Sequence, residues 1–395
     1  MNKPYFFTWS PQSNPINIEI DKSLKHHFIS KNKKVFDFSS ISFQASFGLR
    51  NPTITKSIKS QMKEFSISSP KNTFKLKEDV SYEILKLLKL KGKIFYTLSG
   101  AEGIENAIKV SRLTTNRKVI ACRKNSYHGA TLGAISCSGD WRNKSVYTTK
   151  DILRIPEPTD DPTGIKTTEV VENFGPEKIS AFCLETITGG NGIIIPSIKW
   201  WKAVSKLCTK YKIHLILDEV VCGFGRTGKD FGFQHFKFLK PNFIVLAKAM
   251  TGGFFPLGCI FIDQNISIKF NKTILPCGLT NYAHPLGLAA TRSVLHIIQE
   301  KDYKVNYKII ENTFHELLNN YLKNQNVLSI RKIGLMCAID LKYAIPQNYF
   351  LDNNFYIYIK KNMIILMPHL NIKQSLLRKE FNRLIKVIDN YVKDI

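Results

Sequence analysis

A lysine and an aspartate each follow an apolar run that predicts a buried strand. Lys248 comes directly after Phe243–Ala247, and Asp218 closes the run IHLIL (213–217). A charged amine at the end of a buried strand needs a partner or a chemical function. Two ordinary explanations stay open, since Lys248 could reach the surface along its aliphatic stem or could pair with Asp218. Spacing alone does not choose between these explanations and a catalytic lysine.

A third feature is the small-residue turn Ser99-Gly100-Ala101, which precedes the helical segment 101–112. Such a turn exposes the first N–H groups and the positive end of the helix, which suit a bound phosphate. Small-residue turns before helices are common, so this signal is weak by itself.

Together, a phosphate site, a carboxylate and a desolvated lysine suit the cofactor pyridoxal phosphate. Lys248 would form the Schiff base with the cofactor aldehyde, and burial would lower its pKa so that a neutral amine can act as nucleophile and base. Asp218 would hold the protonated pyridine nitrogen, which keeps the ring an electron sink. The pattern predicts no metal site.

These residues must be positioned by a sheet. Short apolar runs alternate with helical stretches along the middle of the chain, which predicts an α/β fold with a mostly parallel central sheet covered by helices. Because ligands bind beyond the carboxyl ends of such strands, the three features are expected to meet there. The expected strands are 93–98, 118–122, 179–185, 213–220, 243–247 and 258–262, and the expected helices are 101–112, 196–212 and 374–393.

Three regions are expected along the 395 residues. Residues 46–290 would form the large cofactor-binding domain, and residues 291–395 a smaller α+β domain. The N-terminal segment 1–45 would pack with the smaller domain.

Composition excludes several classes of protein. The net charge is +26, but the basic residues are spread along the chain without a nucleic-acid-binding motif, so we expect no nucleic-acid partner. No apolar run is long enough for a membrane span, and the first residues lack the apolar core of a signal peptide, so we expect a cytoplasmic protein. The 8 scattered cysteines form no CxxC pair and are expected to be reduced packing residues.

Several blocks of sequence resemble the class III aminotransferases, which are pyridoxal-phosphate enzymes of fold type I. The strongest is LILDEVVCGFGRTGKDFGFQHFKFLKPNFIVLAKAMTGGFFPLG (215–258), with its Asp-Glu-Val strand end, GFGRTG loop and AK-x-x-TGG-x-x-PLG segment. Supporting blocks are FTWSPQ (7–12), VFDFSS (35–40), LSGAEGIENAIKVSR (98–112), SYHGAT (126–131), ETITGGNGIIIP (185–196) and GLTNYAHPLGLAAT (278–291). The resemblance therefore covers nearly the whole chain.

The resemblance implies roles around the cofactor ring. Lys248 would be the Schiff-base lysine, and Asp218 would face the pyridine nitrogen. Val220 would pack on one face of the ring, and Tyr127 would stack on the other.

It also implies roles around the phosphate and at the ring edge. Gly100 and Ala101 would offer backbone N–H groups to the phosphate. Thr280 would reach the phosphate of the neighbouring subunit, which makes the active unit a homodimer with its sites at the interface. Glu185 would sit beside the cofactor and order its hydrogen bonds.

Other polar residues in these blocks have structural interpretations. We expect Glu219 to be an ion-pair partner, Arg226 a loop anchor and His284 the cap of the following helix. The role of His128 stays open.

The chain also departs from the family pattern. Ala101 stands where Ser or Thr is usual, which removes one hydroxyl contact with the phosphate. The acetylornithine, ornithine and GABA aminotransferases have a Glu where Gly190 stands, and its partner arginine is replaced by Ile365. The mobile arginine of the amine–pyruvate group is not evident either, and the nearest cations there are Lys360 and Lys361. No residue is therefore assigned to the substrate carboxylate.

The resemblance implies a transaminase that moves an amino group from a terminal amine or ω-amino acid to a keto acid such as pyruvate. Diaminopelargonate synthase is an alternative, although its usual loop after the lysine differs from FFPLG, and glutamate-semialdehyde aminomutase is a weaker one. A protein of another kind, which binds the cofactor without turnover, also stays open, because the carboxylate-binding arginine is missing and the stretch 137–158 beside the substrate entrance is short.

Overall fold

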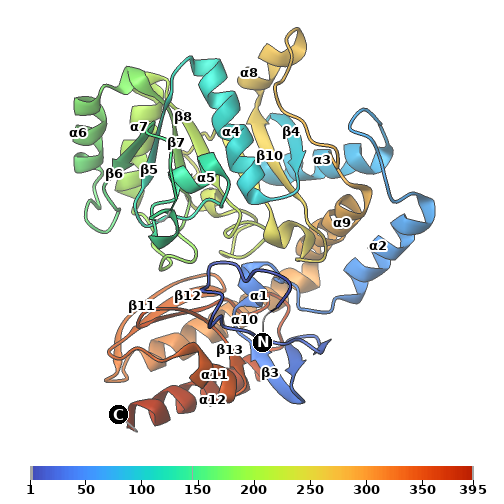
Figure 1. The fold of residues 1–395 in the computed structure, drawn as a ribbon, viewed down its shortest axis with the longest axis vertical. Coiled ribbons are helices and arrows are strands. Elements are labelled where there is room, and N and C mark those ends of the chain that lie inside the picture. Colours follow the sequence, from blue (N-terminus) through green and yellow to red (C-terminus); the bar gives the residue numbers. More distant parts are fainter. Residues whose placement is uncertain (1–2, 145, 394–395) are drawn as a thin grey trace.

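The structure is a computed structural model that describes residues 3–144 and 146–393. Its main element is a seven-stranded sheet in the order β4-β10-β9-β8-β7-β5-β6 (Figure 1). The strands from β9 to β6 pair in parallel, whereas β10 is antiparallel to both of its neighbours. The bounds are β4 Gly92–Thr97, β5 Val119–Arg123, β6 Ile152–Ile155, β7 Ile179–Glu185, β8 His214–Asp218, β9 Phe243–Leu246 and β10 Gly258–Asp263.

Both faces of this sheet are buried, and successive residues of a strand belong to different cores. Leu215 and Leu217 of β8 belong to one apolar cluster, whereas Ile216 between them belongs to a second cluster. Ile244 and Val245 of β9 divide in the same way. Alternating side chains on opposite faces explain why these strands are apolar throughout.

Helices cover each face of the sheet. The helix α4 (Gly100–Thr115) contributes Ile104 to the second cluster, and α7 (Ile198–Tyr211) contributes Trp200 and Trp201 to the first. Both tryptophans are completely buried, as expected for a helix face against the core. The two helices therefore lie on opposite sides of the sheet.

Within the described ranges, no helix combines the length and apolar character that a membrane span needs.

The remaining helices extend the large region and build the smaller one. Their bounds are α1 Ser40–Phe43, α2 Pro52–Glu64, α3 Lys75–Leu88, α5 Leu132–Cys137, α6 Ile165–Phe174, α8 Gln264–Ser267, α9 Pro285–Gln299, α10 Lys301–Tyr321, α11 Gln347–Asp352 and α12 Gln374–Lys393.

Two smaller sheets lie below the large one in Figure 1. One is antiparallel, in the order β11-β12-β15-β14, and the other has the order β1-β2-β3-β13. In the second sheet β13 pairs in parallel with β3, so the N-terminal segment shares a sheet with the C-terminal region. The bounds are β1 Lys22–Ser23, β2 His27–Ser30, β3 Lys33–Asp37, β11 Val327–Ile333, β12 Met336–Leu341, β13 Phe355–Tyr356, β14 Tyr358–Lys360 and β15 Met363–Leu366. The domain limits at residues 45 and 290 stay predictions.

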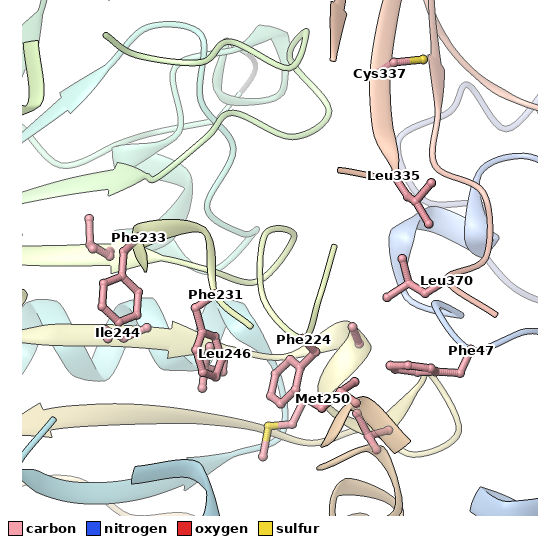
Figure 2. Packing of buried hydrophobic residues seen from close by; sticks show 14 of the residues in the cluster. Phe47, Phe224, Phe231, Phe233, Ile244, Leu246, Met250, Leu335, Cys337 and Leu370 are labelled. Atoms are coloured by element: carbon pink, nitrogen blue, oxygen red, sulfur yellow. The ribbon is translucent and has the colours of Figure 1, made fainter. Parts of the chain in front are cut away.

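One apolar cluster joins the large sheet to the smaller region. Figure 2 shows it running from Ile244 and Leu246 of β9, past Phe224, to Phe47 and Leu370. These residues come from the beginning, the middle and the end of the chain. The strand end that carries the candidate lysine is therefore built on a core that both regions share.

Candidate active site

A cavity of about 620 Å³ lies beyond the carboxyl ends of the parallel strands β7, β8 and β9. Most of the residues predicted from the sequence line it: Gly100, Ala101, Tyr127, Glu185, Asp218, Val220 and Lys248. Thr280 does not. The predicted features therefore meet at one place, as the strand ends required.

The N-terminus of α4 opens onto this cavity. Ser99 caps the helix, because its Oγ accepts a hydrogen bond from the N–H of Glu102 at 3.2 Å. The N–H groups of Gly100 and Ala101 precede the first bonds inside the helix and remain available to a ligand. A Cβ added at Gly100 would lie 2.7 Å from Val220 Cγ2, so the close approach of this turn to Val220 requires glycine. The arrangement can hold a phosphate.

Asp218 is buried and is held by two partners. Its Oδ2 lies 2.8 Å from His128 Nδ1, and its Oδ1 accepts a hydrogen bond from the N–H of Val220 at 3.0 Å. Burial alone would lower the pKa of His128, but the hydrogen bond and charge of Asp218 outweigh it, so the pKa of His128 is raised. His128, whose role the sequence left open, is therefore the residue that positions this carboxylate.

Lys248 begins the short 3-10 helix Lys248–Thr251 at the end of β9 and is half-buried. The ion pair with Asp218 is not formed in the described part of the chain, since Asp218 pairs with His128 instead. Burial lowers the pKa of Lys248, while the charges of Asp218 and Glu185 oppose that shift. A larger fraction of neutral amine follows than at an exposed lysine, which suits a nucleophile and base.

The glycines after Lys248 have the conformation that the tight turn requires. Gly252 and Gly253 have φ of +65° and +81°, a region that L side chains rarely adopt. A Cβ on Gly252 would lie 2.8 Å from Ile54 Cδ1. The turn brings Lys248 Nζ to 5.4 Å from the centre of the Phe43 ring.

Glu185 and Tyr127 are connected at the cavity wall. Glu185 Oε1 accepts a hydrogen bond from the N–H of Tyr127 at 3.2 Å, and its Oε2 accepts one from the N–H of Gly189 at 2.7 Å. Burial raises the pKa of Glu185. The carboxylate thus holds Tyr127 beside the cavity.

Glu219 was expected to form an ion pair, and this is wrong for the described residues. Its carboxylate instead accepts hydrogen bonds from Thr186 Oγ1 at 2.6 Å and from the N–H groups of Gly232 and Phe233 at 2.7 Å each. Burial raises its pKa to about 7. The role is structural, but backbone donors take the place of a cation.

Arg226 and His284 have the expected structural roles. Arg226 is buried and donates to the carbonyls of Leu335 and Pro368 and to the hydroxyls of Ser40 and Ser46. It thereby ties the GFGRTG loop to both ends of the chain. His284 caps α9, since its Nδ1 accepts a hydrogen bond from the N–H of Leu286 at 3.3 Å.

The cavity wall includes residues that the motifs did not single out. Arg142, Trp9, Phe43 and Tyr358 all line it. Two of them gave a signal in advance, since Trp9 lies in the block FTWSPQ and Arg142 lies within the short stretch 137–158 beside the expected substrate entrance. Thr280 is exposed and away from this wall, so its contact with a neighbouring subunit stays a prediction.

Comparison with known proteins gives the class and then the family. The chain has a TM-score of 0.89 and 29% identity with the taurine:2-oxoglutarate aminotransferase of Bifidobacterium kashiwanohense, solved in complex with pyridoxal phosphate and glutamate, over 97% of this chain and 95% of that chain. The fold is that of the fold type I pyridoxal-phosphate transaminases. A model of the class-III aminotransferases matches residues 10–388, so the chain belongs to this family.

Two curated relatives show the range of the family. Gamma aminobutyrate transaminase 2 of Solanum lycopersicum is 27% identical, with 86% of this chain and 81% of that protein covered. The adenosylmethionine-8-amino-7-oxononanoate aminotransferase of Buchnera aphidicola is 28% identical, with 97% and 95% covered. The particular substrate is therefore open within the family.

Class III aminotransferases use pyridoxal phosphate, and the residues of this cavity fit it. The turn at Gly100 leaves helix N–H groups for a phosphate and has no room for a Cβ. Asp218 is an oriented, buried carboxylate that can pair with a protonated ring nitrogen. Lys248 supplies an amine without a carboxylate partner in the described residues.

Proposed function

We propose that the protein is a homodimeric ω-transaminase, which moves an amino group from a terminal amine or ω-amino acid to a keto acid such as pyruvate. The observation that supports this most is the meeting of Lys248, Asp218 and the N-terminus of α4 in one cavity. No other group in that cavity is as well suited to be both covalent anchor and base, since both tasks need a neutral amine at one place.

When bound, pyridoxal phosphate supplies an aldehyde that takes up amines and a ring that withdraws electrons from the substrate carbon. Lys248 Nζ would hold the cofactor through its aldehyde carbon in the resting enzyme. Once displaced by a donor amine, Lys248 Nζ would be the base that accepts the proton from the substrate carbon and returns it at the former aldehyde carbon. Its pKa, which burial lowers, favours the neutral amine that this transfer requires.

The other residues hold the cofactor. Asp218, fixed by His128, would pair with the ring nitrogen, and Val220 and Tyr127 would pack on the two faces of the ring. Glu185 fixes Tyr127 through its backbone N–H.

The phosphate would be held at the N-terminus of α4. The N–H groups of Gly100 and Ala101 would donate to it, and Thr280 of the neighbouring subunit would add a hydroxyl. The exposure of Thr280 in the single chain supports a contact made only in the dimer.

Absorbance of the purified protein tests the proposal. We expect the visible band of lysine-bound cofactor, its loss in Lys248→Ala, and its conversion to the amine form by at least one member of a panel of terminal amines and ω-amino acids. A wild-type protein that binds no added cofactor would rule out the cofactor assignment. A cofactor-loaded protein that no donor converts would favour a binding protein without turnover.

A further inference from the structure

Arg142 is held in a cage of aromatic rings at the cavity wall. Its guanidinium carbon lies 4.4 Å from the ring centre of Tyr127, 5.1 Å from that of Trp141 and 5.6 Å from that of Trp9. Only 13% of its side chain is exposed. A guanidinium stacked in this way is desolvated and fixed in orientation, which is how proteins prepare arginine to bind carboxylates and tetrahedral oxyanions.

The hydrogen bonds of Arg142 leave part of its donor capacity unused. A guanidinium has five N–H donors. Here Nη1 donates to Asp140 Oδ2 and Nη2 donates to the hydroxyl of Tyr358 at 3.3 Å, while Nε is buried without a partner among the described residues. A buried donor without an acceptor is unfavourable, so the site gains from a further anionic oxygen.

The charges around Arg142 are not balanced. Asp140 is buried, and besides Arg142 it accepts a hydrogen bond from Asn191 Nδ2 at 3.1 Å. Asn191 Oδ1 in turn accepts one from Lys360 Nζ. This network of Asp140, Arg142, Asn191 and Lys360 contains two cations and one anion. Its surplus positive charge favours an anionic ligand.

Arg142 and Asn191 of this network line the same cavity as the reactive amine, and aromatic side chains lie along the wall that connects them. Lys248 Nζ lies 5.4 Å from the ring centre of Phe43, and the ring centres of Phe43 and Tyr358 lie 5.1 Å apart. Arg142 in turn donates a hydrogen bond to the Tyr358 hydroxyl. A ligand that reaches from Lys248 to Arg142 must therefore carry its amine and its anion at opposite ends of an apolar linker.

We propose that Arg142 binds the carboxylate or sulfonate at the far end of the amine donor, which makes it a specificity-determining residue of this enzyme. The proposal rests on the transaminase function proposed above. It narrows the donors to ω-amino acids and ω-amino sulfonates, with the guanidinium offering its free N–H groups while Asp140 keeps it in place.

Single-turnover conversion of the cofactor to its amine form tests this proposal. Three donors of equal chain length are compared: an ω-amino carboxylate, the matching ω-amino sulfonate and the n-alkylamine without an anion. In Arg142→Gln we expect the half-saturating concentration to rise about 10- to 100-fold for an anionic donor, from the loss of charge-assisted hydrogen bonds. The carboxylate and sulfonate arms show which of the two anions the site prefers.

The n-alkylamine is the internal reference, and we expect its half-saturating concentration and limiting rate to stay within about twofold in Arg142→Gln, because it makes no contact with the guanidinium. Lys360→Met is the matched second variant, since it removes the other cation of the network. The absorbance band of each variant reports that the cofactor is still bound.

An equal rise in the half-saturating concentration of all three donors in Arg142→Gln would overturn the proposal, because it would show that Arg142 only supports Tyr127. The proposal would also be overturned if Arg142→Gln kept the wild-type preference for anionic donors over the n-alkylamine. The same holds if Lys360→Met, and not Arg142→Gln, lost that preference. These outcomes differ from failure of the transaminase function, in which the wild type itself converts none of the donors.

Discussion

His128 Nδ1 lies 2.8 Å from Asp218 Oδ2, and both side chains are buried beneath the cavity. The carboxylate proposed to hold the ring nitrogen of the cofactor is thus fixed in place before the cofactor binds. An anion kept in this orientation loses little freedom on binding, which favours affinity.

Replacing His128 by Phe is expected to lower the affinity for pyridoxal phosphate about tenfold, because Asp218 loses a charge-assisted hydrogen bond worth roughly 1.5–3 kcal/mol. Titration of the cofactor into cofactor-free protein, followed by absorbance, measures the change. His128→Gln retains an N–H donor and should lose less. Equal affinity in wild type and His128→Phe would contradict the positioning role.

The same pair predicts a pH dependence of stability. The pKa of His128 is raised above its ordinary value of 6.5, so its proton favours the folded state. The stabilisation is complete below pH 6.5 and is lost as the pH rises through the raised pKa. Urea unfolding of cofactor-free wild type and His128→Phe should show a difference in unfolding free energy that shrinks as the pH rises above 6.5. A difference that grows over this range would disprove the interpretation.

Substituting Gly100 by Ala is expected to weaken cofactor binding about tenfold, since the new Cβ would lie 2.7 Å from Val220 Cγ2 and displace the phosphate-binding turn. The dissociation constant of pyridoxal phosphate is the measurement. Gly190→Ala is the matched control, because its Cβ would meet Phe43 Cε2 at an ordinary 3.4 Å. Similar affinities for the two variants would show that space at Gly100 is not limiting.

Arg226→Met is expected to destabilise the protein by about 3 kcal/mol, because it leaves the buried carbonyls of Leu335 and Pro368 without their donor. Burial lowers the pKa of Arg226 to about 10, so it remains charged at neutral pH and every one of its bonds is charge-assisted. Urea unfolding measures the effect. Arg112→Met, which removes one bond to the carbonyl of Lys118, should change stability little. A small effect at Arg226 would show that it does not anchor the two regions.

Thr280→Ala tests the predicted homodimer. Loss of the Thr280 hydroxyl should weaken cofactor binding about tenfold if this hydroxyl reaches the phosphate in the neighbouring subunit. Mixing with Lys248→Ala should then restore sites of full affinity, because the Lys248-containing site of a mixed dimer receives Thr280 from the other chain. Thr273→Ala, on the same exposed segment, is the control. Wild-type affinity in Thr280→Ala would contradict the shared site.

Much of the large sheet could be predicted because most of its strands contain a continuous apolar run that is visible in the local sequence. The apolar run 179–185 became β7 with the same bounds, and the helix 374–393 became α12. The strand expected at 213–220 ends earlier, at Asp218, because the Asp218 carboxylate accepts the N–H of Val220 and turns the chain. Local composition does not reveal such a bond.

The parts of the site that the sequence left open depend on contacts between distant residues. The pairing of His128 with Asp218 joins positions 90 residues apart. The cage around Arg142 takes Trp9 from the N-terminal segment, and Tyr358 of β14 accepts a hydrogen bond from Arg142, so no single block of sequence contains these contacts. Family motifs marked the cofactor side of the cavity, whereas these contacts, which depend on the whole fold, build the other side.

Another long-range bond bears on how the cavity is completed during synthesis. The turn Ser40–Phe43, which has positive φ at all four residues and carries Phe43 to the cavity, is held by the bond from Ser40 Oγ to the carbonyl of Met367, 327 residues later in the chain. A ribosome-bound chain can form the central sheet early, but it cannot fix this wall until the last strands have emerged. In a nascent chain the central sheet can therefore form well before the cavity wall that carries Phe43 is fixed.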